Sequence, residues 1–372
     1  MRYGTMVFVV SLLVMAGLCD AGERVRLKEP HLIPGKVKTQ PTKLDRPEEL
    51  LFELEKYPRT SGSTSAEPLG VWVACRLLNR ECRWPQRGHG MERRLRPLKA
   101  DYKQSDPIHK RYDNRLYGRI VHYGTHGSYT RLIEGQTDLI YECRLPSEDE
   151  RKLMRKKDME LVYTPIALDA FVFLCHQSNS VTGLTAGQVR DIYTKKRDNR
   201  GKIKNWKEVG GSDHPIHAYV RNRNSGSQET MKTLVMKNRK IVGGRSMIGH
   251  GMTGPYNLLH SDKAGIGFTF FYYQRYMSPF PRGRQIRSAQ KQQKVATEPK
   301  PVVRMLAING VKPSRESIAN RTYPWVTEVY VVTRKGLKQN HAAVKLRQWF
   351  LTGEGQRFIG ETGYVPISSA KK

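Results

Sequence analysis

Acidic residues are scarce in this chain: 34 Asp and Glu stand against 65 Lys and Arg, giving a formal net charge of +31. Such an excess raises nucleic acid or an anionic envelope polymer as partners. The basic residues are spread through every segment, however, and dispersed charge is the usual sign of a solvated surface. No zinc-finger spacing, homeodomain pattern or RNA-recognition signature accompanies them, so the sequence contains no specific nucleic-acid motif.

Cysteine is also rare, with five residues in the whole chain. No Cys-x-x-Cys or His-rich spacing occurs, so the sequence predicts neither a metal site nor a cofactor. Cys75 and Cys82 are the favoured disulfide pair if the protein is exported. Two full helical turns would hold them about 10 Å apart, so this pairing requires the helix to end near Asn79. The alternative is four buried thiols, which would include Cys143 and Cys175.

No apolar run reaches the roughly 20 residues that a membrane-spanning helix needs. The run at residues 6–18 follows Arg2 and has the form of a secretory signal, so we expect export and cleavage near Ala21. An uncleaved anchor is the alternative. Lipidation of Cys19 is disfavoured, because bacterial lipoprotein signals place a small residue before the cysteine and Leu18 stands there. The expected location is periplasmic or extracellular.

Apolar periodicity indicates an α/β alternation. Residues 69–78 suit a buried helix, residues 116–122 a strand, and another helix begins within residues 129–133. Such alternation favours a largely parallel sheet covered by helices, with ligand sites at the carboxyl ends of strands where helices begin.

Two extended apolar runs, residues 167–175 and 326–333, are predicted to be strands that cross between lobes. The stretch from 184 to about 271 contains its own helices and strands, which favours a second lobe inserted within the first. A basic tract with little apolar content is expected to be an exposed, mobile insertion. The predicted domains are a signal peptide (1–21), a polar linker (22–50), the first part of lobe I (51–166), lobe II (167–325) with the basic insertion (281–301), and the return to lobe I (326–372).

Several helix starts carry capping chemistry. Thr185 and Gln188 form a capping box whose role is structural. Three others are rich in small hydroxyl and glycine residues: 62–65, 124–128 and 225–228. A helix amino terminus offers unpaired N–H groups and a partial positive charge, and serine and threonine hydroxyls add donors. Arg221 adds a charged fork for two oxygens, so the set predicts a cage for a tetrahedral oxyanion.

An ordered series of motifs, from about residue 57 to residue 367, resembles the periplasmic phosphate-binding proteins of ABC-type phosphate importers, the PstS-like proteins. The resemblance implies a two-lobed type II periplasmic-binding-protein fold (PBP domain), each lobe a mixed, mainly parallel sheet flanked by helices, with two crossing strands joining them. It implies capture of inorganic phosphate and an ABC transporter permease as partner. The motifs lie at residues 57–69, 164–170, 184–193, 205–211, 221 with 225–227, 264–268, 313–314, 322–324, 353–356 and 363–366.

Carried over position by position, the resemblance implies an anion held from both lobes. The family's usual acidic acceptor would fall at Cys143, with Glu142 beside it. A carboxylate there accepts the proton of hydrogen phosphate and repels an oxyanion without a proton. Phosphate is favoured if Glu142 substitutes for it, and sulfate or another oxyanion is a candidate if neither residue does. The implied ligand-binding residues are Thr64, Ser65, Thr125, Glu142, Arg221, Ser225, Gly226 and Ser227.

Other function classes are weighed on the same residues. Ser225 or Ser63 as an enzyme nucleophile would lack a nucleophile-elbow pattern and an identifiable base, so no enzymatic activity is predicted. His126 would make affinity depend on pH near neutrality if it faces the anion, and would be inert if it faces solvent. A basic envelope or nucleic-acid-binding adhesion protein on the same fold is the main alternative to a receptor.

Overall fold

The structure, a computed structural model, describes residues 56–78, 82–84, 94–97, 115–194, 202–242, 248–249, 251–277 and 302–367. The predicted signal peptide (1–21), linker (22–50) and basic insertion (281–301) lie outside these residues. Across the described part of the chain, no helix has the length and apolar character needed to cross a membrane.

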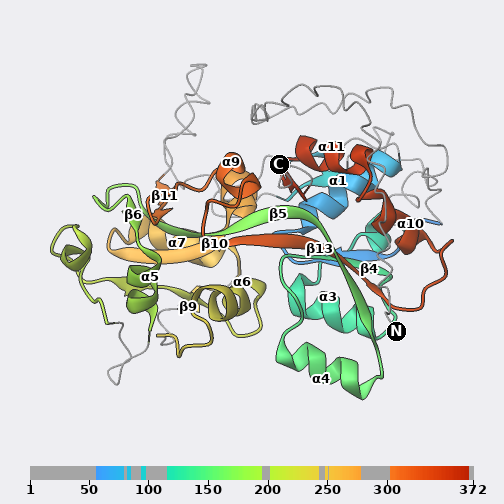
Figure 1. Cartoon of the computed structure of the whole chain (residues 1–372), viewed down its shortest axis with the longest axis horizontal. Coiled ribbons are helices and arrows are strands. Elements are labelled where there is room, and N and C mark those ends of the chain that lie inside the picture. Colours follow the sequence, from blue (N-terminus) through green and yellow to red (C-terminus); the bar gives the residue numbers. More distant parts are fainter. Residues whose placement is uncertain are drawn as a thin grey trace, which may run out of the picture.

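Two long strands run across the middle of the molecule and join its two lobes (Figure 1). They are β5 (Leu161–His176) and β13 (Val326–Arg334), which pair in antiparallel fashion. Pro165 of β5 stands opposite Tyr330 where the register shifts, because proline has no N–H to donate to a regular ladder. Both expected crossing strands are present, although β5 begins earlier than the apolar run predicted.

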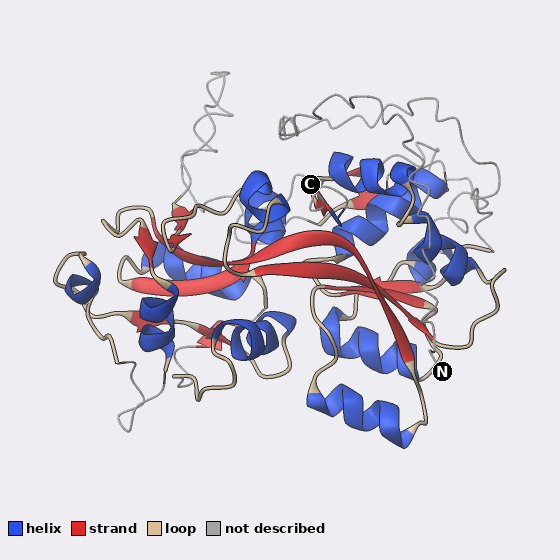
Figure 2. Cartoon of the chain, in the orientation of Figure 1, coloured by secondary structure: helices blue, strands red, loops and turns tan. Residues whose placement is uncertain are grey.

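A mixed eight-stranded sheet extends through both lobes, as Figure 2 shows. Besides the two long strands it contains β1 (Thr60–Gly62), β4 (Leu139–Glu142), β7 (His217–Ala218), β10 (Gly265–Phe270), β11 (Val303–Met305) and β14 (Val365–Pro366). The order is β1-β4-β13-β5-β10-β7, with β11 and β14 also paired to β5. Pairs that involve β5 or β13 are antiparallel, whereas β1–β4 and β7–β10 are parallel. Each lobe therefore contains one parallel pair of this sheet, and every other pair in the sheet includes β5 or β13 and is antiparallel.

Helices cover the sheet in both lobes (Figure 1). The first lobe contains α1 (Glu67–Leu77), α3 (Gly124–Ile133), α4 (Glu148–Lys156), α10 (Ala342–Trp349) and α11 (Gly353–Glu361). The second contains α5 (Ala186–Tyr193), α6 (Gly226–Thr230), α7 (Thr253–Ser261) and α9 (Arg315–Ala319), and α6 continues as a wider turn over Met231–Val235. Short strands complete the fold: β2 (Cys82–Arg83), β3 (Arg96–Pro97), β6 (Gly183–Leu184), β8 (Val220–Arg221), β9 (Ile248–Gly249) and β12 (Ala307–Ile308).

An aromatic cluster forms the core of the second lobe. Phe171 and Phe173 of β5 pack against Phe268 of β10, with the Phe171 and Phe268 ring centroids 5.2 Å apart. Trp325 and Tyr193 close the cluster around Phe173. All five side chains are buried, and burying each stabilises the fold by about 1.5–3 kcal/mol. This packing gives the elements that carry the site a rigid support.

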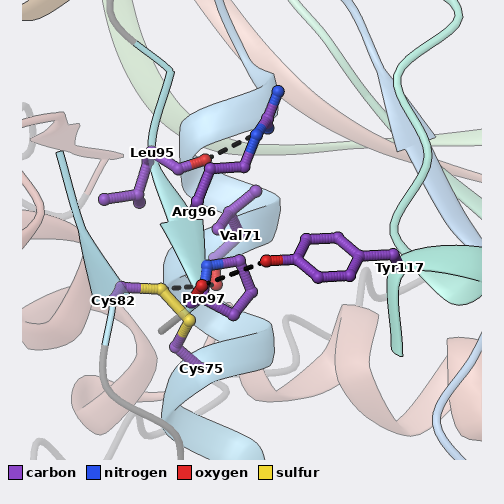
Figure 3. Close-up of a disulfide and its surroundings, with 7 residues drawn as sticks. All are labelled: Val71, Cys75, Cys82, Leu95, Arg96, Pro97 and Tyr117. Carbon is purple, nitrogen blue, oxygen red and sulfur yellow. Dashed lines mark hydrogen bonds between the residues drawn. A yellow bond between two sulfur atoms is a disulfide. The ribbon is translucent and has the colours of Figure 1, made fainter. Parts of the chain in front are cut away.

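The disulfide between Cys75 and Cys82 is confirmed (Figure 3). Helix α1 ends at Leu77, which brings the two Cα atoms to 6.0 Å, within disulfide reach. The bridge ties the carboxyl end of α1 to the small β2–β3 pair, and Tyr117 secures that pair by donating a hydrogen bond to the Pro97 carbonyl. Within the described residues, Cys143 and Cys175 are buried free thiols.

One local expectation is wrong. The strand expected at residues 116–122 is a helical turn over residues 115–119, and only Ile120 makes a parallel bridge, with Thr60. The Ile120 N–H donates to the Leu116 carbonyl, so these apolar residues four apart follow a helical spacing. The next helix begins at Gly124, as the helix start predicted at residues 124–128 requires, and Gly124 adopts a positive φ of 69° that favours glycine.

Candidate functional site

A cavity of about 320 Å³ lies between the two lobes, at the amino-terminal ends of α3 and α6. Apart from its arginines the lining is largely uncharged, and it combines hydroxyl and amide side chains with Tyr123, Met252 and Phe270. Among the described residues that line it, none is Asp or Glu. The first lobe contributes Ser63, Thr64, Ser65, residues 123–127, Cys143 and Arg144, and the second contributes residues 221–227, Gly251, Met252 and Phe270.

The loop between β1 and α1 supplies the first wall of the cavity. The Ser63 N–H donates to the Tyr141 carbonyl at 3.0 Å, which fixes this loop to the end of β4. A Cβ at Gly62 would lie 2.5 Å from the Tyr141 carbonyl oxygen, so only glycine allows this approach. The Ser65 hydroxyl donates to the Cys143 sulfur at 3.2 Å, and the Thr64 hydroxyl lies 3.2 Å from His122 Nε2.

Arg221 and the start of α6 supply the second wall. The Arg221 side chain is only 6% exposed and donates from Nη1 to the Ser227 hydroxyl at 3.0 Å. Its backbone N–H donates to the Gln228 side chain at 2.9 Å, and the Ser225 hydroxyl caps α6 by accepting from the Gln228 N–H. Met252 lies against the same guanidinium, 3.1 Å from Nη1. The short helix thus orients the arginine and its hydroxyl neighbours toward the cavity.

The two walls meet at Thr125 and Gly226. A Cβ on Gly226 would lie 2.5 Å from the Thr125 Oγ1, closer than real side chains approach. Thr125 is the second residue of α3, is 7% exposed and lines the cavity. The glycine therefore allows the lobes to come into contact beside the cavity.

Glu142 lies behind the first wall. It is the last residue of β4, is 0% exposed and does not line the cavity. Burial raises the pKa of Glu142 to about 8; Arg144 lowers the pKa and Glu150 raises it. The Thr125 and Ser63 hydroxyls are close enough to lower the pKa as well, yet neither carboxylate oxygen has a partner at hydrogen-bond geometry.

Cys143 lines the cavity in the thiol form. Burial raises the pKa of this thiol well above its ordinary value, and the charge of Asp169 raises it further. The position that the resemblance assigns to an acidic acceptor therefore holds a neutral group, which carries no charge to repel an anion.

Arg144 is a cavity residue that the sequence did not indicate. Its guanidinium donates two hydrogen bonds to the buried carboxylate of Glu150, at 2.7 and 2.8 Å. The Ser147 N–H also donates to Glu150, and His126 Nδ1 lies 3.1 Å from it. Burial opposes the ionised carboxylate, but Arg144 and these neighbours hold the pKa of Glu150 below its usual value. The Ser147-x-x-Glu150 capping box, a few residues after β4, could have indicated a helix start and its carboxylate next to Arg144.

The structure brings together most of the residues that the resemblance implied. His126, half exposed, also lines the cavity. Glu142 is the implied residue that does not reach the cavity, since its side chain is completely covered. Those that line it are Thr64, Ser65, Thr125, Arg221, Ser225, Gly226 and Ser227.

Comparison with known proteins identifies the family of this chain. The chain matches the family described as the PBP superfamily domain over residues 117–354, and it belongs to that family. This is a family of substrate-binding proteins and not of enzymes. The fold agrees with that of a Clostridium perfringens chain described as a phosphate ABC transporter substrate-binding protein, solved with bound phosphate. The TM-score is 0.52 at 17% identity, covering 83% of this chain and 98% of that one.

Two curated relatives are similar to this chain in sequence. The phosphate-binding protein PstS of Staphylococcus epidermidis is 26% identical over 253 residues, covering 67% of this chain and 69% of the relative. Protein SphX of Synechococcus elongatus is 24% identical over 252 residues, covering 66% of this chain and 67% of the relative. The PstS-like resemblance and the α/β type II fold are therefore confirmed.

Proposed function

We propose that this protein is an exported receptor that captures inorganic phosphate, or a closely similar tetrahedral oxyanion, between its lobes and delivers it to an ABC-type transporter. One observation carries the proposal: the cavity lining contains three arginines, six serine and threonine residues and, within the described chain, no carboxylate. Hydroxyl and guanidinium groups are donors that match an oxyanion, and buried guanidinium contacts are among the stronger hydrogen bonds. The relatives named as phosphate-binding proteins support the same ligand class.

Capture would follow from closure of the lobes. Each wall offers half of the donors, and bending of β5 and β13 would bring the second half onto an anion held by the first. We infer that residues 51–166 with 326–372 move against residues 167–325 as two units. Closure excludes water, and in a dry cleft each donor binds the anion more strongly.

The neutral thiol of Cys143 bears on the choice between phosphate and sulfate. With no ionised carboxylate in the described lining, the cavity has no group that must accept a proton from the ligand. We therefore expect the protein to bind both anions, without strong discrimination against sulfate.

A second candidate function rests on the formal charge of +31. A basic surface binds anionic polymers, including nucleic acid and envelope polymers, and such binding falls steeply with salt. Capture of a small anion in a cavity that the lobes close over is much less sensitive to salt. The salt dependence of binding therefore distinguishes the two functions.

The test is isothermal titration of the protein, without its expected signal peptide, with phosphate and with sulfate. Arg221→Ala removes a buried charged donor and is expected to weaken phosphate binding by about 100-fold, or ~2.7 kcal/mol. Arg155→Ala is the matched control, because it removes one positive charge from an exposed position on α4, outside the cavity, and should leave affinity unchanged. Equal affinities for the two variants would contradict the proposal, and a steep loss of wild-type binding with salt would favour the polymer.

A further inference from the structure

Glu142 is a buried acid whose position is explained neither by contact with the cavity nor by a hydrogen-bond partner. It is completely buried, yet both carboxylate oxygens lack a hydrogen-bond partner. Leaving a buried polar group unpaired costs about 1–3 kcal/mol, and more for an ionised one. A leucine or methionine of similar size would avoid this cost. The carboxyl group therefore has a function other than stabilising the fold.

Two hydroxyls that line the cavity lie near this carboxyl. The hydroxyls of Ser63 and Thr125 both act on Glu142, and both residues line the cavity. A hydroxyl has one proton, which it can direct either to the carboxylate behind it or to an anion in front of it. Glu142 and a bound anion therefore compete for the same two protons.

We propose that Glu142 sets the affinity of the cavity for anions from behind its wall: the protonated acid leaves the Ser63 and Thr125 hydroxyls free to donate to the anion, and the carboxylate draws their protons away. This inference rests on the proposed function, because it assumes that an oxyanion occupies the cavity. It makes Glu142 a positioning residue that never touches the ligand.

The proton balance is simple. When the anion binds to protein with ionised Glu142, the carboxylate takes one proton from solvent and becomes a carboxylic acid, which donates back to a hydroxyl oxygen. The hydroxyl protons turn to the anion, and no covalent bond changes. The ligand supplies no proton, so sulfate and phosphate couple to the same uptake.

Several charged and titratable groups face Glu142 from the elements packed against it. Arg144 favours the ionised form, whereas Glu150 of α4 opposes it. Tyr129 of α3 and Tyr330 of β13 face it as neutral phenols, because burial raises the pKa of both. The Cys143 thiol beside it is neutral as well. Burial is the largest influence, and with a pKa of about 8 Glu142 is protonated at neutral pH and ionised in alkaline solution.

The test uses sulfate, because this anion does not titrate over the range measured. Wild-type affinity should stay nearly level up to about pH 7, fall about twofold by about pH 8 and about tenfold by about pH 9, as Glu142 ionises. Glu142→Gln removes the titration and should give a flat profile at an affinity close to that of the wild type at neutral pH. Calorimetry in two buffers of different ionisation enthalpy should show proton uptake by the wild type at about pH 8.5, and none by the variant.

Asp169→Asn is the matched control for a second buried acid. Asp169 is also unexposed, has its pKa raised to about 7 by burial, and lies outside the cavity, so its variant should keep the tenfold fall. Wild-type and Glu142→Gln profiles that fall alike would overturn the inference while leaving the proposed function intact. Failure of the wild type to bind phosphate or sulfate at any pH would overturn both.

Discussion

The two walls of the cavity use different chemistry to offer donors to one ligand. In the first wall the hydroxyls of Ser63, Thr64 and Ser65 stand in front of buried titratable groups, Glu142 and Cys143, whose pKa values are raised. In the second wall the donors gather around the guanidinium of one buried arginine at the start of α6. We therefore expect protonation to change the first wall, whereas the second wall keeps a fixed charge.

Arg144 sharpens this comparison, because it belongs to the first wall but is bound to Glu150. We predict that Glu150→Ala lowers the free energy of unfolding by about 3 kcal/mol, since it leaves a mostly buried guanidinium without its carboxylate. Urea denaturation of the wild type and the variant measures the change in the free energy of unfolding. The pKa of Glu150 is lowered in the folded protein, so the stabilisation is present above the ordinary carboxyl pKa and is lost as pH falls through the lowered one. Glu148→Ala, on the exposed face of the same helix, is the control and should leave the free energy of unfolding unchanged.

Placing a charge in the first wall should break the expected tolerance for sulfate. We predict that Cys143→Asp weakens sulfate binding by about 30-fold, or ~2 kcal/mol, because an ionised carboxylate repels an anion that has no proton to donate. Hydrogen phosphate can donate a proton to that carboxylate, so its affinity should fall much less. Titration calorimetry with both anions gives the ratio. Cys143→Asn is the control of similar size, and a loss of sulfate binding there as large as in Cys143→Asp would contradict the charge argument.

The contact between the walls predicts a smaller effect. Gly226→Ala places a Cβ 2.5 Å from the Thr125 hydroxyl oxygen and should hold the lobes apart, which we expect to weaken phosphate binding by about tenfold. Gly353→Ala is matched in chemistry, has open space around its Cβ and lies outside the cavity, so its affinity should equal that of the wild type. Unchanged binding by Gly226→Ala would show that the walls need not meet at this point.

Most residues of the second wall and some of the first could be predicted from the sequence, because the groups at a helix start come from a few consecutive residues. At a helix start, glycine offers its backbone N–H, and serine offers both its backbone N–H and its hydroxyl. Residues 225–227 carry these groups at consecutive positions. The crossing strands were also predictable, since a long apolar run buried on both faces is recognisable by itself.

The position of Glu142 could not be predicted in the same way. All four residues of β4 are buried, so the strand alternates between two covered faces and gives no hint of which side chains reach the cavity. Glu142 lies near the Ser63 loop and α3, and this tertiary packing cannot be read from the sequence of β4 itself. The role of Arg144 likewise depends on packing with α4, and the helical turn at 115–119 was mistaken for a strand because short apolar runs fit both periods.

The most direct test of the account is diffraction from crystals of the protein grown with phosphate. The account predicts a tetrahedral density between the walls, within hydrogen-bond distance of Arg221, of the Ser227 hydroxyl and of at least one hydroxyl of Ser63, Thr64 or Thr125. Glu142 should remain behind these hydroxyls without touching the anion. Phosphate bound elsewhere, with the cavity holding only water, would contradict the account.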